Sequence, residues 1–390
     1  MTSVTRRFGV ATTLIALALG VAACGSDSKP AATTGTTAGT TPSSGAADST
    51  PASGVTAEGI SAEECAANKA AGKITYLSGF DFSAEASIID VIVAKQKGYF
   101  EKMCLDVELR PGLSTTNYPL VAANQAQFSS AGNLTEILNF STSGARFVAL
   151  ANYGKAPIEA LVTKDPTITD LTQLKGKTIG VKGDLPPSLV AMLAKAGLVR
   201  GTDYKEIILE GYDPVAQLQL DIDALPVYKN NEPRALDAAG VKYALFDPAK
   251  SDIPGSFGLI YTSAQFAKDH PTAVAGFTRA ALRGMEDAIA DPAAAVKMSV
   301  DMINAAGNQY FLTEEGETFR WTTELGIIKD ATPAGEPIGL IDPDRFKSEY
   351  DAYEAAGAFP DGAPELYDAW DADLARSMYD SSGKVIWPAS

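Results

Sequence analysis

Histidine and cysteine are scarce in this chain of 390 residues, which contains one histidine and three cysteines. A transition-metal site needs several such side chains close together, so the sequence predicts no metal centre. The phosphate-binding pattern G-x-x-x-x-G-K-[ST], the dinucleotide pattern G-x-G-x-x-G and the nucleophile pattern G-x-S-x-G are also absent. His270 directly precedes the proline that opens a predicted helix, which is typical of a solvated helix end. We therefore expect a protein that is not an enzyme and uses no cofactor.

Positive charge is also in short supply, with 32 lysines and arginines against 48 aspartates and glutamates and a formal net charge of −16. Nucleic acids and anionic membrane surfaces are bound through basic patches, so neither is an expected partner. An acidic protein can still bind an anion locally, and the net charge therefore does not decide the ligand.

Long apolar runs are missing except near the N-terminus, where residues 8–23 follow Arg6 and Arg7. This run is too short to cross a bilayer as a helix, and it has the layout of a secretory signal peptide. It ends in Val-Ala-Ala before Cys24, which resembles the lipobox of bacterial lipoproteins. The resemblance implies cleavage before Cys24 and a diacylglycerol on its sulfur. An ordinary secretory peptide with a chance cysteine is the alternative.

The segment after the signal peptide is poor in residues that can build a core. Residues 1–23 are the predicted lipoprotein signal peptide, and residues 24–57 hold Cys24 and a tract rich in Thr, Ala, Gly, Ser and Pro. Such a tract cannot bury enough apolar surface to fold, so we expect a disordered linker between the anchor and a globular part.

Two cysteines, Cys65 and Cys104, lie in the globular part. An isolated pair in an oxidising, exported setting favours a disulfide over a metal site or a nucleophile. Two free, buried thiols are the alternative.

Strand-like and helix-like segments alternate from residue 73 onward, which predicts α/β units with mostly parallel sheets covered by helices. The pattern predicts lobe 1 from residues 58–153 and 256–390 and lobe 2 from residues 154–255. The chain crosses between the lobes twice. From Phe257 one more strand is expected, and the rest of the chain should be helical, including a helix at Pro364–Tyr379. Another long helix is predicted at Ala84–Met103. Ligands of such folds bind beyond the carboxyl ends of parallel strands, between the lobes.

Several short motifs occur in an order and spacing that resemble one family of binding proteins. They are Ala94–Phe100 (AKQKGYF), Leu105–Leu109 (LDVEL), Pro111-Gly112, Leu174–Val181 (LKGKTIGV), Asn231–Pro233 (NEP) and Asp252–Pro254 (DIP). The sequence resembles the periplasmic binding proteins that bind the thiamine pyrimidine precursor, taurine, alkanesulfonates or nitrate. The resemblance covers about residues 73–300. It implies a two-lobed clamshell that delivers a solute to an ABC importer.

The resemblance places part of the ligand site on lobe 1. The family's aromatic residue after the first strand falls on Phe82, preceded by Asp81 as in the pyrimidine branch. Where that branch has Asn and then His, this chain has Glu85 and Ile88. Asn133, after a later strand, falls near a polar contact of the family.

Lobe 2 supplies the other expected contacts, because Tyr228 and Glu232 match the spacing of the Tyr and Glu that flank the pyrimidine. A ring stacked on an aromatic side chain, with its amino group hydrogen-bonded to a carboxylate, is a sound binding mode. The alternative is that Phe82 and Tyr228 belong to the core, while Glu85 and Glu232 complement helix dipoles.

The predicted cleft is poorly suited to an anion. Pro186 and Pro187 open a helix without N–H groups to donate, and Asp184, Glu85 and Glu232 would repel negative charge. We therefore expect a small heteroaromatic solute, with a pyrimidine and a flavin-like ring both open. The alternative within the same class is an aliphatic sulfonate, taurine or nitrate.

The expected role is a monomeric, extracytoplasmic substrate-binding lipoprotein that is held on the bacterial membrane by its lipid. Its partners are the solute, an ABC permease and the ATPase of that permease. A lipid-anchored sensor or partner-binding protein is the alternative from another functional class.

Overall fold

The computed structural model describes residues 55–56, 59–141, 144–359 and 361–388. Cys24 and the predicted signal peptide lie outside these residues, as does most of the predicted linker. The linker's Val55 and Thr56 are described, and they form β1, which pairs with β2 (Gly59–Ile60). No helix in the described ranges combines the length and the apolar character needed to cross a membrane.

Lobe 1 is built on a five-stranded sheet with the order β4-β3-β5-β12-β6. Its strands are β3 (Lys73–Leu77), β4 (Asp106–Arg110), β5 (Phe128–Ala131), β6 (Phe147–Gly154) and β12 (Phe257–Ser263). Strand β3 runs parallel to β4 and β5, whereas β12 runs antiparallel to both of its neighbours. The helices that belong to these strands are α1 (Ala62–Ala70), α2 (Ile89–Gln96), α3 (Tyr99–Lys102), α4 (Ser114–Ala122) and α5 (Leu134–Phe140).

Lobe 2 is built on a second five-stranded sheet with the order β11-β7-β10-β8-β9. Its strands are β7 (Glu159–Thr163), β8 (Thr178–Val181), β9 (Lys205–Ile208), β10 (Ala224–Tyr228) and β11 (Ala244–Phe246). Here β7 is the antiparallel strand, and β8 runs parallel to β9 and β10. Its helices are η1 (Leu171–Leu174), α6 (Pro187–Lys195), α7 (Pro214–Gln217), α8 (Glu232–Ala238) and η2 (Pro248–Ser251).

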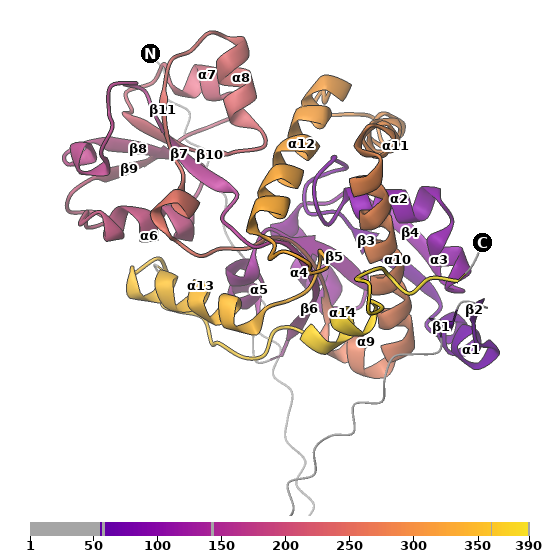
Figure 1. Ribbon diagram of the computed structural model, residues 1–390. Helices are drawn as coiled ribbons and strands as arrows, with labels where there is room; N and C mark the ends of the chain where they lie inside the picture. The colour runs from indigo at the N-terminus through magenta and orange to yellow at the C-terminus, as the bar shows by residue number, and fades with distance from the viewer. Residues whose placement is uncertain (1–54, 57–58, 142–143, 360, 389–390) are drawn as a thin grey trace, which may run out of the picture. The chain divides into compact units, whose positions relative to one another are not determined.

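The chain passes between the sheets twice, from β6 to β7 and from β11 back to β12 (Figure 1). In each sheet the strand that enters after a crossing is the antiparallel one. The predicted fold class is confirmed: two lobes, each a mixed and mostly parallel sheet flanked by helices, with two crossings and a helical C-terminal region.

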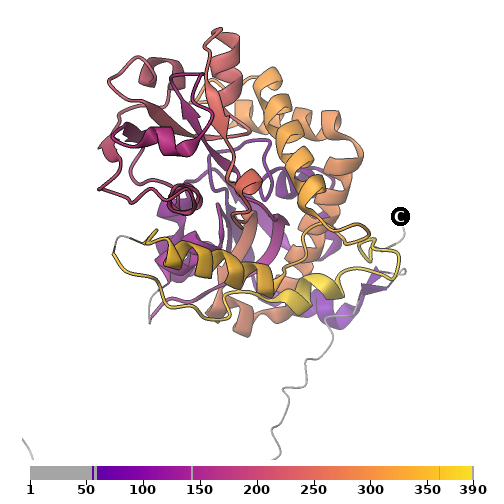
Figure 2. The ribbon, with the colours of Figure 1, turned by 60° about the vertical axis from the view of Figure 1, so that its left-hand side comes forward.

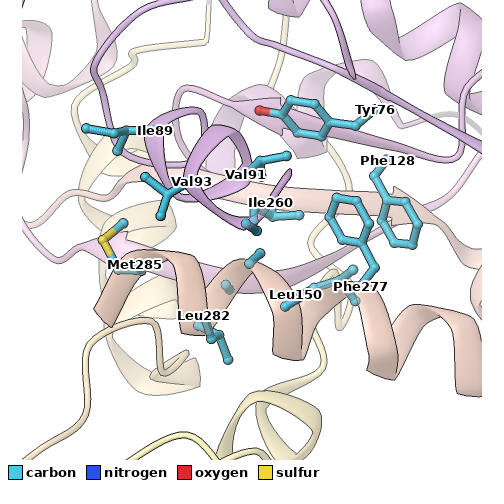
Figure 3. Close-up of a cluster of buried hydrophobic side chains, with 14 of the residues drawn as sticks. Tyr76, Ile89, Val91, Val93, Phe128, Leu150, Ile260, Phe277, Leu282 and Met285 are labelled. Carbon is cyan, nitrogen blue, oxygen red and sulfur yellow. The ribbon is translucent and has the colours of Figure 1, made fainter. Parts of the chain in front are cut away.

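The core of lobe 1 lies between its sheet and the helices α2 and α10 (Pro271–Ala290), as Figure 3 shows. Phe128 and Phe277 stack with their ring centroids 3.9 Å apart and their planes nearly parallel. Gly284 permits the close approach of the two helices, because a Cβ there would lie 2.0 Å from the carbonyl oxygen of Asp90. Such a close-packed interior is sensitive to the loss or gain of single methylene groups.

The C-terminal region contains α9 (Ala264–Asp269), α10, α11 (Pro292–Ala305), α12 (Glu314–Ala331), α13 (Pro343–Ala355) and α14 (Ala372–Ser377). Helix α13 contacts both lobes and lies near α6 in Figures 1 and 2. Its Phe346 and Tyr350 join a hydrophobic cluster of lobe 1, whereas Tyr353 joins the main cluster of lobe 2. The Tyr353 hydroxyl also donates to the carbonyl of Pro254, at 2.9 Å, on the second crossing.

Two predicted helices are wrong in extent. Ala84–Met103 contains α2 and α3, separated by Gly98 in the left-handed conformation, and residues 84–88 are not helical. Within Pro364–Tyr379, only α14 forms.

The observed pairing of Cys65 with Cys104 is a disulfide with a Cα–Cα distance of 5.2 Å, and it ties α1 to the segment before β4. That distance is ordinary for such a bond.

Candidate functional site

The segment of residues 78–88, which follows β3, is hydrogen-bonded to acidic side chains of the distant helix α12. The backbone N–H of Ala84 donates to Glu317 at 2.6 Å, and that of Ala86 donates to Glu324 at 2.6 Å. Ser87 has a positive φ of 72°, which few non-glycine residues adopt. The two carboxylates therefore accept hydrogen bonds from backbone N–H groups of a segment that lies outside regular secondary structure.

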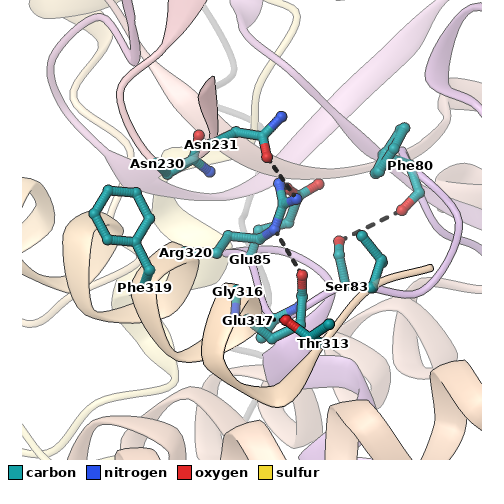
Figure 4. A network of polar contacts seen from close by, with 12 residues as sticks. Phe80, Ser83, Glu85, Asn230, Asn231, Thr313, Gly316, Glu317, Phe319 and Arg320 are labelled. Carbon is teal, nitrogen blue, oxygen red and sulfur yellow. Dashed lines mark hydrogen bonds and ion pairs between the residues drawn. The ribbon is translucent and has the colours of Figure 1, made fainter. Parts of the chain in front are cut away.

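Arg320 of α12 is the centre of a polar cluster that joins the lobes (Figure 4). Its guanidinium donates to Glu85 at 3.1 Å, to Glu317 at 3.2 Å and to the Asn231 side chain at 3.3 Å. Asn231 stands at the N-terminal end of α8 in lobe 2. One cation of the C-terminal region therefore holds the post-β3 segment and lobe 2 together.

A second hydrogen bond between the lobes lies beside this cluster, where the side-chain amide of Asn230 donates to Glu324 at 2.6 Å. Burial raises the pKa of Glu85, and Arg320 counteracts part of that effect. Burial also raises the pKa of Glu324 well above its usual range. Although burial opposes the charge on Arg320, the neighbouring carboxylates raise its pKa. The cluster therefore holds a permanent cation beside carboxyl groups that resist ionisation.

On lobe 2, Tyr228 ends β10 and Glu232 begins α8. Glu232 is 4% exposed and uses both carboxylate oxygens. One accepts from the backbone N–H of Tyr228 at 2.8 Å, and the other pairs with Lys182 at 2.8 Å. Glu232 thus fixes the end of β10 and neutralises the lysine that follows β8.

Tyr228 is 49% exposed. The pKa of that hydroxyl is raised first by loss of hydration and then by the negative charges of Glu159, Glu232, Glu136 and Glu85. These carboxylates come from both lobes. Tyr228 is therefore half-exposed at the end of β10, and its hydroxyl lies within electrostatic reach of acidic side chains from both lobes.

Helix α13 carries a further carboxyl group near the crossings. Glu349 is buried, and burial raises its pKa to about 8. This value includes the effect of Ser256 on the second crossing, which lowers the pKa, and that of Glu159 at the start of β7, which raises it. Burial also raises the pKa of Glu136 and of Glu159. The region between the crossings therefore collects carboxyl groups from lobe 1, lobe 2 and α13.

The remaining predicted residues lie on lobe 1. Asp81 has a positive φ of 41°, and its side chain accepts from Gln309 at 3.1 Å. Phe82 is 4% exposed and packs in a small apolar cluster with Ile88, Ile92 and Ile303. Asn133 caps α5, accepting from the backbone N–H of Glu136 at 2.9 Å.

A cavity of about 200 Å³ lies between α8 of lobe 2 and the connection that leads from α11 into α12. Asn231 and Arg234 line it on one side, and Phe311, Thr313 and Arg320 line it on the other. Arg320 thus borders both this cavity and the cluster with Glu85.

Sequence reasoning missed the contribution of α12. Glu317, Arg320 and Glu324 are spaced i, i+3 and i+7, so they share one face of the helix. That spacing was the available signal, although it does not reveal what the face contacts.

Across the described ranges, no group of three or more Cys, His, Asp and Glu side chains is arranged to hold a metal ion.

The fold and the interlobe cleft define a solute-binding protein of the periplasmic binding protein type. The model of the NMT1/THI5-like family matches residues 85–295, more than half of the chain. The chain belongs to this family and is a substrate-binding protein of it.

A curated relative is the riboflavin-binding protein RibY of Chloroflexus aurantiacus, which is 28% identical over 157 residues. The match covers 40% of this chain and 44% of RibY, so it spans less than half of either protein.

Solved structures share the fold. The aliphatic sulphonate binding protein SsuA of Escherichia coli aligns with a TM-score of 0.56 and 12% identity, over 76% of this chain and 89% of SsuA. The putative sulfonate-binding SsuA of Methylobacillus flagellatus aligns with a TM-score of 0.54 and 14% identity, over 78% of this chain and 93% of the other. These low identities establish the fold alone.

Proposed function

We propose that the protein is the solute-binding component of an ABC importer and that it captures a small heteroaromatic solute between its lobes. The observation that carries this proposal is the half-exposed Tyr228, which lies among carboxylates of both lobes. Its ring offers a stacking face, and the carboxylates accept hydrogen bonds from the N–H groups of a nitrogen heterocycle.

The charges of the cleft argue against an anionic solute. Lys182 is paired with Glu232, and Arg320 is paired with Glu85 and Glu317. An incoming sulfonate or nitrate would meet cations that are already paired with carboxylates. A neutral or weakly basic ring has no such penalty.

The ring could be a pyrimidine or a flavin. The resemblance to the pyrimidine-precursor binders supports the first, and the similarity to RibY supports the second. Both rings present N–H groups beside carbonyl or ring-nitrogen acceptors, which suits a cleft that has Glu85 and Arg320 on one wall and Tyr228 on the other.

The proposal includes a place of action outside the cytoplasm. Cys24 carries the lipid that holds a monomer at the membrane, and hinge motion at the two crossings closes the lobes over the solute. The closed form docks on a permease that is driven by an ATPase. If Cys24→Ser still partitions into detergent like the wild type, the anchoring part of the proposal fails.

The test of the ligand class is mass spectrometry of the solute that copurifies with the native protein and is released by denaturation. We expect a nitrogen heterocycle in stoichiometric amount. Recovery of a sulfonate, or tight binding of taurine or nitrate by a preparation that binds no ring compound, would overturn the heteroaromatic assignment.

A further inference from the structure

The connection between α11 and α12 presents an aromatic side chain to the interlobe cavity. Phe311 is 87% exposed and has a φ of 55°, in the left-handed region that bulky residues rarely occupy. A large apolar side chain that is both solvated and held in an unfavourable backbone conformation is costly on both counts. Such features gather at binding sites, where the surrounding structure maintains them.

The structure maintains this one through its neighbours. The Asn308 side chain accepts from the backbone N–H of Leu312 at 2.7 Å and donates to the Leu312 carbonyl at 2.9 Å. Tyr310 stacks on Phe80 with ring centroids 5.1 Å apart, and Gln309 donates to Asp81. The connection is therefore fixed to the post-β3 segment of lobe 1, and Phe311 is presented at a defined position.

Lobe 2 supplies the opposite side of the cavity. Two polar contacts between α12 and α8 border it: Arg320 with Asn231 at 3.3 Å, and Arg234 with Glu315 at 2.9 Å. Arg234 therefore lies on the cavity wall that lobe 2 supplies, and Phe311 lies on the opposite wall. Guanidinium planes and aromatic rings both stack on flat ligands.

We infer that this cavity is a second aromatic subsite of the solute site, in which Phe311 stacks on one ring of a fused heteroaromatic solute. The inference rests on the proposed function. Arg320 borders both the cavity and the Glu85 cluster, so a solute held beside Glu85 extends into the cavity through an additional ring. A cavity of about 200 Å³ accommodates part of such a solute. Phe311 lies outside the residues that the family model matches, whereas Asn231 and Arg234 on the opposite wall lie within them.

The test compares two ligands, riboflavin and 4-aminopyrimidine, in wild type, Phe311→Ala and Phe311→Trp, by calorimetry. We expect Phe311→Ala to weaken riboflavin binding about tenfold and Phe311→Trp to preserve it. The affinity for 4-aminopyrimidine should stay unchanged in both variants. Ile208→Ala, which removes another exposed apolar side chain on the edge strand β9, is the matched control and should bind both ligands as wild type does.

Three results overturn the inference. If Phe311→Ala binds riboflavin as tightly as wild type does, the subsite is absent while the proposed function stands. If both ligands weaken equally, Phe311 serves a single ring site instead of a second subsite. If wild type binds neither ring compound, the proposed function fails together with the subsite. An unchanged melting temperature of Phe311→Ala shows that any loss of affinity does not come from unfolding.

Discussion

The two walls of the cleft are built in different ways. On lobe 1, the segment with Glu85 is held by α12, through hydrogen bonds between residues 233 and 238 positions apart in the sequence. On lobe 2, Tyr228 is held by Glu232, four residues further along the chain. The first wall therefore depends on tertiary packing of the C-terminal region, whereas the second is encoded locally.

This difference predicts that the segment with Glu85 loses its defined position when α12 is disturbed. Among the variants considered, Arg320→Ala should lower the free energy of unfolding most. The substitution leaves the buried Glu317 and Glu324 and the partly buried Glu85 without their cation. We expect the free energy of unfolding to fall by about 3–5 kcal/mol, as for other buried ion pairs that lose one partner. Urea unfolding monitored by circular dichroism measures this change.

The control for Arg320→Ala is Arg234→Ala, which breaks the ion pair between Arg234 of α8 and Glu315 of α12. Glu315 is 84% exposed in its side chain, so that pair should contribute at most about 1 kcal/mol. Equal losses in the two variants would contradict the view that α12 holds lobe 1 through its buried face.

The next largest loss in the free energy of unfolding is expected when the disulfide of lobe 1 is removed. Replacing Cys65 and Cys104 together by serine opens a link between positions 39 residues apart. The chain-entropy model gives a loss of about 3–4 kcal/mol in the free energy of unfolding. Because the bond lies away from the cleft residues described above, solute affinity should be unchanged at temperatures where the variant is folded. Calorimetric titration of the folded variant provides the check, and a large loss of affinity would show that α1 influences the cleft.

A pH dependence is expected from Glu349, which lies on the helix that contacts both lobes. The pKa of this carboxyl is 4.5 in the ordinary state and about 8 in the folded protein, so the folded state binds the additional proton between these values. The contribution of Glu349 to stability is present below pH 4.5 and is lost as the pH rises to about 8. Glu349→Gln imitates the protonated form, so its stability relative to wild type should increase from pH 5 to pH 8. Urea unfolding at both pH values measures this, and a constant difference would refute it.

The smallest effect on folding is expected from Glu232→Gln on lobe 2. The amide retains an acceptor for the backbone N–H of Tyr228 but loses the charge that pairs with Lys182. We expect the affinity for a ring solute to fall by about 1.5–3 kcal/mol, typical of hydrogen bonds to charged groups. The free energy of unfolding should fall by less than it does for Arg320→Ala, because Lys182 is partly exposed to water. A variant that binds as wild type does would show that solute binding does not depend on the charge of Glu232.

The same contrast explains how far the sequence could predict the molecule. The alternation of strands and helices gave the fold class, because hydrophobic period and helix-capping residues are local signals. The placement of Tyr228 and Glu232 relative to β10 and α8 was predictable for the same reason. Residues 84–88 were predicted as helix, since nothing near them in the sequence reveals that Glu317 and Glu324 bind their N–H groups. Arg320 and Phe311 were missed because their meaning depends on segments that only folding brings together.

The helix predicted at Pro364–Tyr379 failed for a related reason. Tyr350 donates to the Pro364 carbonyl at 2.7 Å, and Tyr367 donates to the Phe147 carbonyl at 3.0 Å, so this stretch is held to lobe 1 by tertiary hydrogen bonds. Such contacts replace the hydrogen bonds of a helix, and a periodic pattern alone does not report them.

Calorimetric titration of riboflavin, 4-aminopyrimidine and taurine into wild type and Tyr228→Ala tests the central claim most directly. The acidic cleft should bind at least one of the ring compounds and not taurine. Tyr228→Ala, whose half-exposed side chain contributes little to folding, should lose that binding while its melting temperature stays close to that of wild type. Tight binding of taurine by wild type, or undiminished binding of the ring compound by Tyr228→Ala, would contradict the claim that an aromatic solute rests on Tyr228 between the lobes.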